Sequence, residues 1–408
     1  MLQKSFVEKE FFKIFHSMDK ILSPFRQSKL LNTLFLSNIF VSFHYALIIY
    51  INSTYLSNFF SETQVSALYI IGAIINTFLL LNASKILEKI GNYRFVVYVI
   101  IIEFFSTIGM VASATPFLIG LYFLTHTIAI SLIYFNMDIF VESLCKSEGQ
   151  TGSIRATYLT MANLTIVFAP IVVAFLLTSN IYAYVYLASA TSLLPLYHLI
   201  KKFKKLELKV IRHIRIKETL TEYIKNKDLY NIFISNFLLQ LFYAFMVVYV
   251  PLYLERYIGF SWTEIGIMFT IMLLPFVLFE VPVGDLADEK YGEKEFLTIG
   301  FVVMGLATLF ISFVTVQSFW IWTTILFITR IGASFVEVTS ESYFFRHVDQ
   351  NKTDVISFFR ITRPLSFLAG PIIATITLQF VPFQYIFIVI GAFMILGTHY
   401  SLAIRDTK

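Results

Sequence analysis

The segment KKFKKLELKVIRHIRIKETLTEYIKNKD, residues 201–228, divides this chain of 408 residues into two halves of similar length. It carries ten Lys and Arg residues, whereas the whole chain is 57% hydrophobic, is only 14% charged and has a mean hydropathy of +0.75. Such an apolar chain cannot cover itself with a polar surface, so lipid is its main solvent. Anchoring to anionic lipid on the inner leaflet explains the basic segment without a nucleic-acid partner, and we expect none.

Uninterrupted apolar runs in both halves reach the ~20 residues that an α-helix needs to cross a hydrocarbon core. Lys and Arg gather in alternate loops, and the positive-inside rule then places both termini and the 201–228 linker in the cytoplasm. Residues 1–28 are interpreted as a cytosolic amphipathic segment. We therefore predict an all-α, multi-pass protein of the cell membrane, with twelve transmembrane helices at 30–52, 64–83, 95–114, 117–143, 156–178, 182–200, 231–254, 264–283, 296–316, 319–345, 357–380 and 384–404.

The two halves resemble each other. SNIFVSFHYA at 37–46 aligns with SNFLLQLFYA at 235–244, an offset of 198 residues. Asp138 and Glu142 match Glu337 and Glu341 at an offset of 199, and the prolines of VFAPIV and LAGPII follow at 201. A nearly constant offset across six spans indicates a duplicated unit, and an even number of spans makes the repeats parallel. The predicted domains are six-helix bundles at 29–200 and 229–408.

A charged loop in the second half, GDLADEKYGEKE at 284–295, falls between the eighth and ninth predicted spans. Its Gly284, Asp288, Gly292 and Lys294 resemble the signature loop of the major facilitator superfamily. The equivalent loop of the first half, NASKILEKIGNYRF, keeps Gly91 but lacks the other Gly and the Asp. The resemblance covers the whole chain through span number, duplication and central linker, and it implies the twelve-helix fold of that superfamily.

The same resemblance implies a cytoplasmic gate. In sugar porters of the superfamily, Glu residues at the ends of spans 4 and 10 pair with Arg residues at the starts of spans 11 and 5. Glu142 would then meet Arg360 or Arg363, and Glu341 would meet Arg155. The simpler alternative is that these charges only hold the halves together. The predicted gate residues are Glu142, Glu341, Arg155, Arg360, Arg363, Gly284, Asp285, Asp288, Gly292 and Lys294.

Charged and polar side chains deeper in the spans are costly unless they are paired or hydrated. Arg330, Glu337 and Glu341 share one face of a helix, because they are seven and four residues apart. Such a face must point at protein or water, and a deep carboxylate can take up protons because burial disfavours its charged form. A permanent Arg330 bridge to Glu337 or Asp138 is the alternative. Candidates for substrate contact or proton coupling are Asp138, Glu337, Arg330, His44, Tyr45, Asn38, Asn236, Gln240 and Tyr243.

Three further ionisable residues are weaker candidates. Glu280 lies four residues before Gly284, Glu103 lies in a span that is peripheral in the fold, and His126 is as consistent with packing as with a lining role. Prolines in spans 5, 8 and 11 can act as hinges. The single Cys145 excludes an internal disulfide and a multi-cysteine metal site, and we expect no metal site and no cofactor.

These features favour a monomeric secondary transporter that moves a small organic solute by rocker-switch alternating access. Aromatic and mildly polar cavity candidates with a few carboxylates favour a proton-coupled exporter of drug-like compounds. A sugar or small-metabolite importer is an alternative, and so is a membrane sensor that does not transport. A membrane enzyme is disfavoured, because the extracytoplasmic loops are short and offer only Glu62 and Glu255 as carboxylates.

Overall fold

The structure is a computed structural model, and it describes residues 28–144, 148–179, 181–206, 216–348 and 353–405. Within these ranges every regular element is helical. The predicted amphipathic segment 1–28 lies almost entirely outside them, as do Cys145 and the middle of the linker. The side chains of Glu142, Arg155, Asp285 and Asp288 also lie outside the described part.

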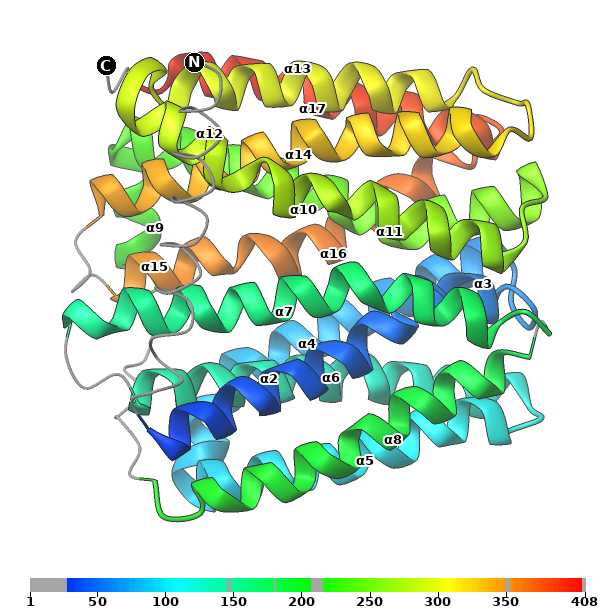
Figure 1. Cartoon of the computed structure of the whole chain (residues 1–408), viewed down its shortest axis with the longest axis vertical. Coiled ribbons are helices and arrows are strands. Elements are labelled where there is room, and N and C mark those ends of the chain that lie inside the picture. The colour runs from blue at the N-terminus through cyan, green and yellow to red at the C-terminus, as the bar shows by residue number, and fades with distance from the viewer. Residues whose placement is uncertain (1–27, 145–147, 180, 207–215, 349–352, 406–408) are drawn as a thin grey trace, which may run out of the picture.

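The described helices fall into a first half and, after the linker, a second half (Figure 1). The first half comprises α2 Lys29–Ile48, α3 Asn52–Leu56, α4 Glu62–Ile90, α5 Asn92–Ala112, α6 Pro116–Leu144, α7 Glu148–Leu176 and α8 Tyr182–Ile200. The linker carries η2 Lys201–Phe203 and α9 Ile216–Lys225. The second half comprises α10 Lys227–Leu252, η3 Tyr253–Ile258, α11 Trp262–Leu278, α12 Glu280–Leu286, η4 Ala287–Tyr291, α13 Glu293–Ile311, α14 Phe319–His347, α15 Thr353–Arg360, α16 Thr362–Thr377, η5 Phe383–Tyr385 and α17 Ile386–Ala403.

Eleven helices in the described ranges are long and apolar enough to cross a membrane. The predicted eleventh span, 357–380, differs because it is divided at Ile361 into α15 and α16. Pro364 explains the division: a proline has no N–H to donate to the carbonyl four residues earlier, at Arg360, and its ring crowds that carbonyl. Helix α16 completes the set of twelve spans, and the fold is the predicted twelve-helix arrangement of two parallel repeats.

The turns of the two halves are built alike. Ser61 and Ser261 begin α4 and α11, and each forms a reciprocal capping box with the side chain three residues later, Gln64 or Glu264. Gly91 and Gly292 occupy the equivalent turns that follow, with φ of 83° and 89°. Only glycine adopts this conformation without strain, which explains why the first copy of the loop motif keeps Gly91 after losing its other glycine.

Packing inside the halves repeats as well. Helix α2 packs on α7 and α8, as α10 packs on α16 and α17, and α5 packs on α6 as α13 packs on α14. The Asn38 amide donates to the Tyr158 carbonyl on α7 at 2.6 Å, and the Asn236 amide donates to Thr362 Oγ1 on α16 at 2.9 Å. Both asparagines are buried. The duplication therefore extends to individual interhelical hydrogen bonds.

Replacing either asparagine with alanine should cost about 1 kcal/mol of stability, because one buried interhelical hydrogen bond is lost in each case. Thermal unfolding of Asn38→Ala and Asn236→Ala in detergent tests this, with Asn163→Ala, an exposed residue of α7, as the control. Losses in the two halves that differ severalfold would contradict equivalent roles for the two residues.

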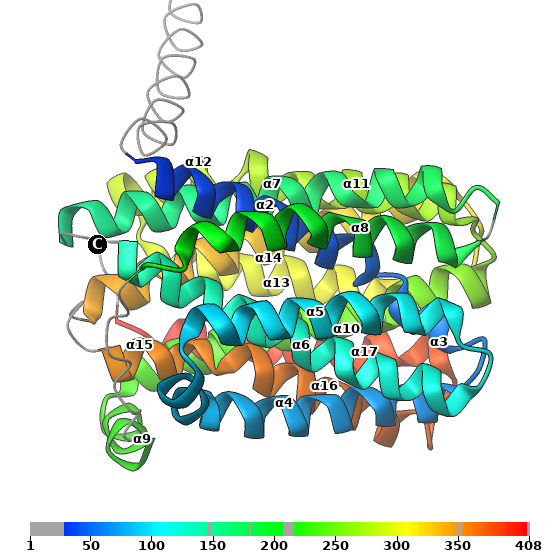
Figure 2. The same ribbon diagram turned by 90° about the horizontal axis from the view of Figure 1, so that it is seen from below.

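Two seams join the halves. Helix α7 packs against α11, and α4 packs against α16. Figure 2 shows these pairs on opposite sides of the bundle. We name the end with η2, α9 and α15 the linker end, and the end with α3 and η3 the distal end (Figure 1).

Candidate functional site

Arg330 lies in the interior of α14 and is only 2% exposed. Its guanidinium lies over the Phe242 ring at 5.0 Å and the Tyr243 ring at 5.7 Å, both from α10. Its Nε and Nη1 atoms have no hydrogen-bond partner. Cation–π contacts offset part of the cost of burying a charge, but the unpaired N–H groups still carry a desolvation penalty. Arg330 is therefore an energetically expensive residue held near the middle of the protein.

Glu337 lies two helical turns further along α14, as the seven-residue spacing predicts. The Tyr243 hydroxyl donates to its Oε2 at 2.6 Å. Glu280, at the start of α12, lies within electrostatic reach of the same carboxylate. In the described part of the chain, Arg330 and Glu337 form no ion pair within 4 Å, so the permanent bridge considered for these two residues is not present.

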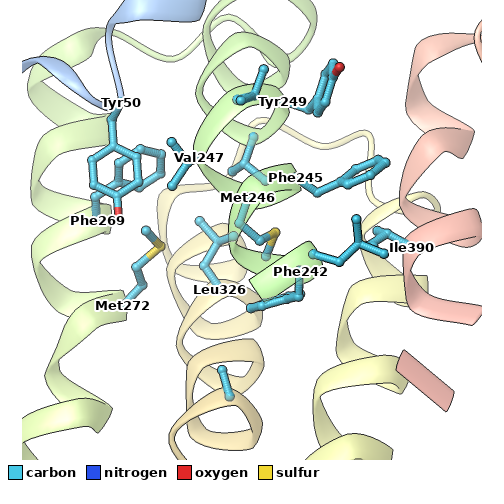
Figure 3. Packing of buried hydrophobic residues seen from close by; sticks show 14 of the residues in the cluster. Tyr50, Phe242, Phe245, Met246, Val247, Tyr249, Phe269, Met272, Leu326 and Ile390 are labelled. Carbon is cyan, nitrogen blue, oxygen red and sulfur yellow. The ribbon is translucent and has the colours of Figure 1, made fainter. Parts of the chain in front are cut away.

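The first half reaches this cluster through Tyr50. Its ring packs against Phe269 of α11 at 5.0 Å between centroids, and its hydroxyl lies within hydrogen-bonding reach of Arg330. Figure 3 shows Tyr50 beside Phe269 and above Met272, with Phe242 and Met246 on the neighbouring helix. The charged centre of the second half is thus covered on its distal side by an aromatic residue from the first half.

Arg363, at the start of α16, connects the halves at a second point. It lies within electrostatic reach of Glu337 in its own half and of Tyr45 and Tyr134 in the other. The Tyr45 and Tyr134 rings meet edge to face at 5.8 Å. Asp138, one turn further along α6, also lies within electrostatic reach of Tyr134. Asp138 and Arg363 are both exposed.

The distal end is closed by contacts between the halves. The Trp262 indole donates to the Tyr182 hydroxyl at 3.0 Å, and the Ser66 and Tyr249 hydroxyls lie 2.9 Å apart. Further hydrogen bonds join Arg256 to Asn58 and Tyr257 to Glu62. Among the described residues, direct hydrogen bonds between the halves gather toward this end, which the structure therefore holds shut.

Gly266 permits the closest approach in this closure. A Cβ atom added to Gly266 of α11 would lie 2.6 Å from the Ala174 Cβ of α7, and closer still to the Pro170 carbonyl oxygen. Real Cβ atoms essentially never approach other atoms so closely. The seam between α7 and α11 can close this tightly only because position 266 has no side chain.

At the linker end, a charge pair within the second half joins α14 to α15. Arg360 pairs with Glu341 of its own half, with one N–O distance of 3.0 Å. The α15–α16 break at Ile361 is what separates Arg360 from the rest of the span. Because the side chains of Glu142 and Arg155 lie outside the described part, the expected pairs Glu142–Arg360, Glu142–Arg363 and Glu341–Arg155 remain predictions.

The signature loop binds its own half together. Gly292 provides the turn before α13, and Glu293 is fully buried after it. Glu293 pairs with Arg346 at 3.1 Å and accepts a hydrogen bond from Ser342 at 3.1 Å, so it ties α13 to the end of α14. The sequence interpretation missed both Glu293 and Arg346. Lys294 is half-buried beside them, and Gly284 faces α14 with room for a Cβ.

Several predicted site residues lie elsewhere. Asn38 and Asn236 bind neighbouring helices rather than lining the space between the halves. His44 points into the first bundle and contacts Glu103, which corrects its expected place in the cavity wall. Gln240 and Tyr243 are half-buried, and their role as lining residues stays a prediction. The sequence did not single out Tyr50 and Tyr134. Each lies within electrostatic reach of an arginine from the other half, Arg330 for Tyr50 and Arg363 for Tyr134.

A separate hollow of about 630 Å³ opens at the linker end of the second half. Its wall includes Lys225, Asp228, His347 and Arg405, and it contains none of the central residues. This hollow lies within one bundle and does not lead between the two, so we do not assign it to the transport path.

Comparison with known proteins gives a family match over the second half and similar solved structures over the whole chain. Residues 232–406 match the family model described as Major Facilitator Superfamily. No curated protein matches the sequence. Among solved structures, a bacterial homologue of the iron transporter ferroportin in an inward-facing state is similar with a TM-score of 0.71 and 16% identity, covering 93% of this chain and 100% of that one. The nucleoside transporter NupG is similar with a TM-score of 0.68 and 13% identity, covering 92% and 99%.

The family model covers the second half, and the first half is joined to it by the sequence repeat, the matching turns and the matching interhelical bonds. The similar solved structures cover both halves in one arrangement. Residues 232–406 therefore match the Major Facilitator Superfamily model, and the whole chain shares its fold with these two solved structures.

Proposed function

We propose that this protein moves a small organic solute by alternating access, with its halves rocking about the centre formed by Tyr50, Tyr243, Arg330, Glu337 and Arg363. The observation that carries the proposal is the combination of a distal end shut by contacts between the halves and exposed charges, Asp138 and Arg363, beside the interface. Such a molecule is closed on one side and accessible from the other. Opening the distal seam while closing the linker end would expose the same centre to the opposite side.

Proton coupling is the second part of the proposal. Glu280 and Glu337 are two carboxylates within electrostatic reach of each other, and two such charges in a poorly hydrated site cannot both stay ionised at low cost. Protonation of Glu337 would also change its hydrogen bond with Tyr243 and its attraction to Arg363. A bound proton can therefore alter contacts that reach both halves.

The residues around the centre favour an amphipathic organic substrate. Tyr45, Tyr134 and Tyr243 offer aromatic surfaces with polar tips, and Asp138 and Glu337 offer negative charge. The similar solved structures are a bacterial homologue of an iron transporter and a nucleoside transporter, and identities of 16% and 13% carry neither substrate over to this chain. The Asn38 and Asn236 amides, which would have suited a sugar, are occupied by helix contacts. We therefore favour export of drug-like compounds, with both termini on the cytoplasmic side of the cell membrane.

Proteoliposomes containing a pH-sensitive dye test the proposal. Ethidium, a labelled sugar and a labelled nucleoside would be supplied in parallel, and proton movement would be followed together with solute flux. We expect ethidium flux with proton movement in the wild type, and a loss of proton movement of about tenfold or more in Glu337→Gln. Glu295→Gln, an exposed residue at the start of α13, is the matched control.

Each outcome separates two readings. Undiminished proton-coupled flux in both Glu337→Gln and Asp138→Asn contradicts the coupling mechanism. Flux of the sugar or the nucleoside without ethidium overturns the substrate class. Ligand binding with no flux of any solute supports a membrane sensor and overturns transport.

A further inference from the structure

Three ionisable side chains from three helices meet inside the first bundle, away from the centre described above. His44 comes from α2, Glu103 from α5 and His126 from α6. His44 Nε2 lies 2.7 Å from Glu103 Oε1, and His126 Nδ1 contacts the same oxygen. Their exposed fractions are 0%, 0% and 1%. The three side chains offer ligand atoms that all lie within 4.8 Å of one another.

The second nitrogen of each imidazole has a polar neighbour. His44 Nδ1 lies 3.1 Å from the Ser189 carbonyl oxygen and 2.7 Å from Ser189 Oγ. His126 Nε2 lies 3.5 Å from the Asn52 amide, which is held by the Tyr186 hydroxyl at 2.7 Å. Histidines that bind metal characteristically donate their free N–H to a carbonyl, carboxylate or water, which fixes the ring and its tautomer. The Ser189 carbonyl and hydroxyl oxygens share that position for His44, and the hydroxyl oxygen is the closer of the two.

Glu103 provides an independent sign of an incomplete site. Thr107 donates to its Oε1 at 3.3 Å, so this oxygen has three neighbours, while the fully buried Oε2 has no hydrogen-bond partner. An unpaired carboxylate oxygen inside a bundle is costly, and native proteins rarely leave one so. This unpaired Oε2 atom belongs to the same side chain that both histidines contact.

We propose that His44, Glu103 and His126 form a binding site for a divalent first-row transition ion such as Zn²⁺. Two imidazoles and one carboxylate are a donor set that such ions favour. Bonds of about 2.0–2.2 Å hold ligand atoms about 3–3.5 Å apart, slightly further than the His44–Glu103 separation of 2.7 Å. A small rotation of the Glu103 carboxylate would bring Oε2 to the ion and release the crowded Oε1.

The charge balance limits the affinity. A divalent ion on one carboxylate leaves one positive charge in the bundle interior, which is unfavourable in a membrane protein. We therefore expect exchangeable binding in the micromolar range rather than a permanently bound ion. The site connects α2, α5 and α6 within the first half alone, so an ion there would stiffen that half without depending on the proposed transport activity.

The test uses the full-length protein in detergent, stripped with a chelator and titrated with Zn²⁺ under chelator competition. We expect about one ion per chain in the wild type, and binding at least about tenfold weaker in Glu103→Gln. Gln retains a hydrogen-bond acceptor for the histidines, so this variant should stay folded, which size-exclusion chromatography checks. His399→Gln, an exposed histidine of α17, is the matched control and should bind like the wild type.

Ser189→Ala is a second variant, because it removes the hydroxyl beside His44 while leaving all three ligands in place. We expect about tenfold weaker Zn²⁺ binding there as well. Co²⁺ provides a spectroscopic check: a visible absorption band should appear in the wild type and be absent in Glu103→Gln. Folded wild-type protein that binds no Zn²⁺ in the micromolar range overturns the proposal, and so does equal binding by the wild type and Glu103→Gln. If solute flux is unchanged after the ion is removed, the metal site is separate from transport.

Discussion

Transport is expected to be almost abolished when Gly266 is replaced by leucine, although the protein still folds. The seam between α7 and α11 has no room even for a Cβ at this position, because Ala174 and the Pro170 carbonyl lie against it. Overpacking of this kind costs about 1–3 kcal/mol, and each 1.4 kcal/mol changes a conformational ratio tenfold. The variant should therefore favour the state in which the distal end is open.

Solute flux in proteoliposomes and the reactivity of a cysteine introduced at the distal end measure this effect. We expect Ser66→Cys, which is buried against Tyr249, to react slowly alone and about tenfold or more faster with Gly266→Leu. Gly370→Ala is the control, since a Cβ there would meet Ala244 at an ordinary 3.4 Å within one half. Slow labelling combined with normal flux in Gly266→Leu would show that the close packing at position 266 does not hold the distal end shut.

Replacing Arg330 with methionine should remove transport while leaving the fold as stable or more stable. Two nitrogen atoms of this buried guanidinium, Nε and Nη1, lack partners, and each unsatisfied buried group costs about 1–3 kcal/mol. Glu337 would keep its bond from Tyr243, so the substitution leaves no carboxylate without a partner. Replacing buried charge with apolar side chains of similar volume is often neutral or stabilising by about 1–4 kcal/mol.

Thermal unfolding in detergent and solute flux, measured on the same preparation, test this prediction. We expect an unchanged or raised unfolding temperature together with a flux about a hundredfold lower, if the charge at the centre is needed for function. Arg405→Met is the control, because its side chain is 85% exposed and pairs with Asp228 at 3.3 Å, a contact worth about 0–1 kcal/mol. Lower stability with retained transport in Arg330→Met would show that the residue is structural.

The internal repeat was visible in the sequence, and it predicted much of the fold. Apolar runs set where helices cross the membrane, and a constant offset between matching residues required two parallel bundles. Even the turn glycines, Gly91 and Gly292, could be paired in this way before their shared φ was known. Helix breaks were harder to predict from the sequence. Pro364 is a local reason for the break at Ile361, whereas no proline marks the division of the first span between Ile48 and Asn52.

The sequence by itself determined the class of protein, the number and order of its spans and the face on which Arg330, Glu337 and Glu341 align, because hydropathy and helical period are local properties of the chain. It did not determine which charges meet. His44 turned toward Glu103 rather than the space between the halves, and Arg360 reached Glu341 of its own half. Those outcomes depend on how each helix is rotated about its axis, and that rotation is set by packing against neighbours far away in the sequence.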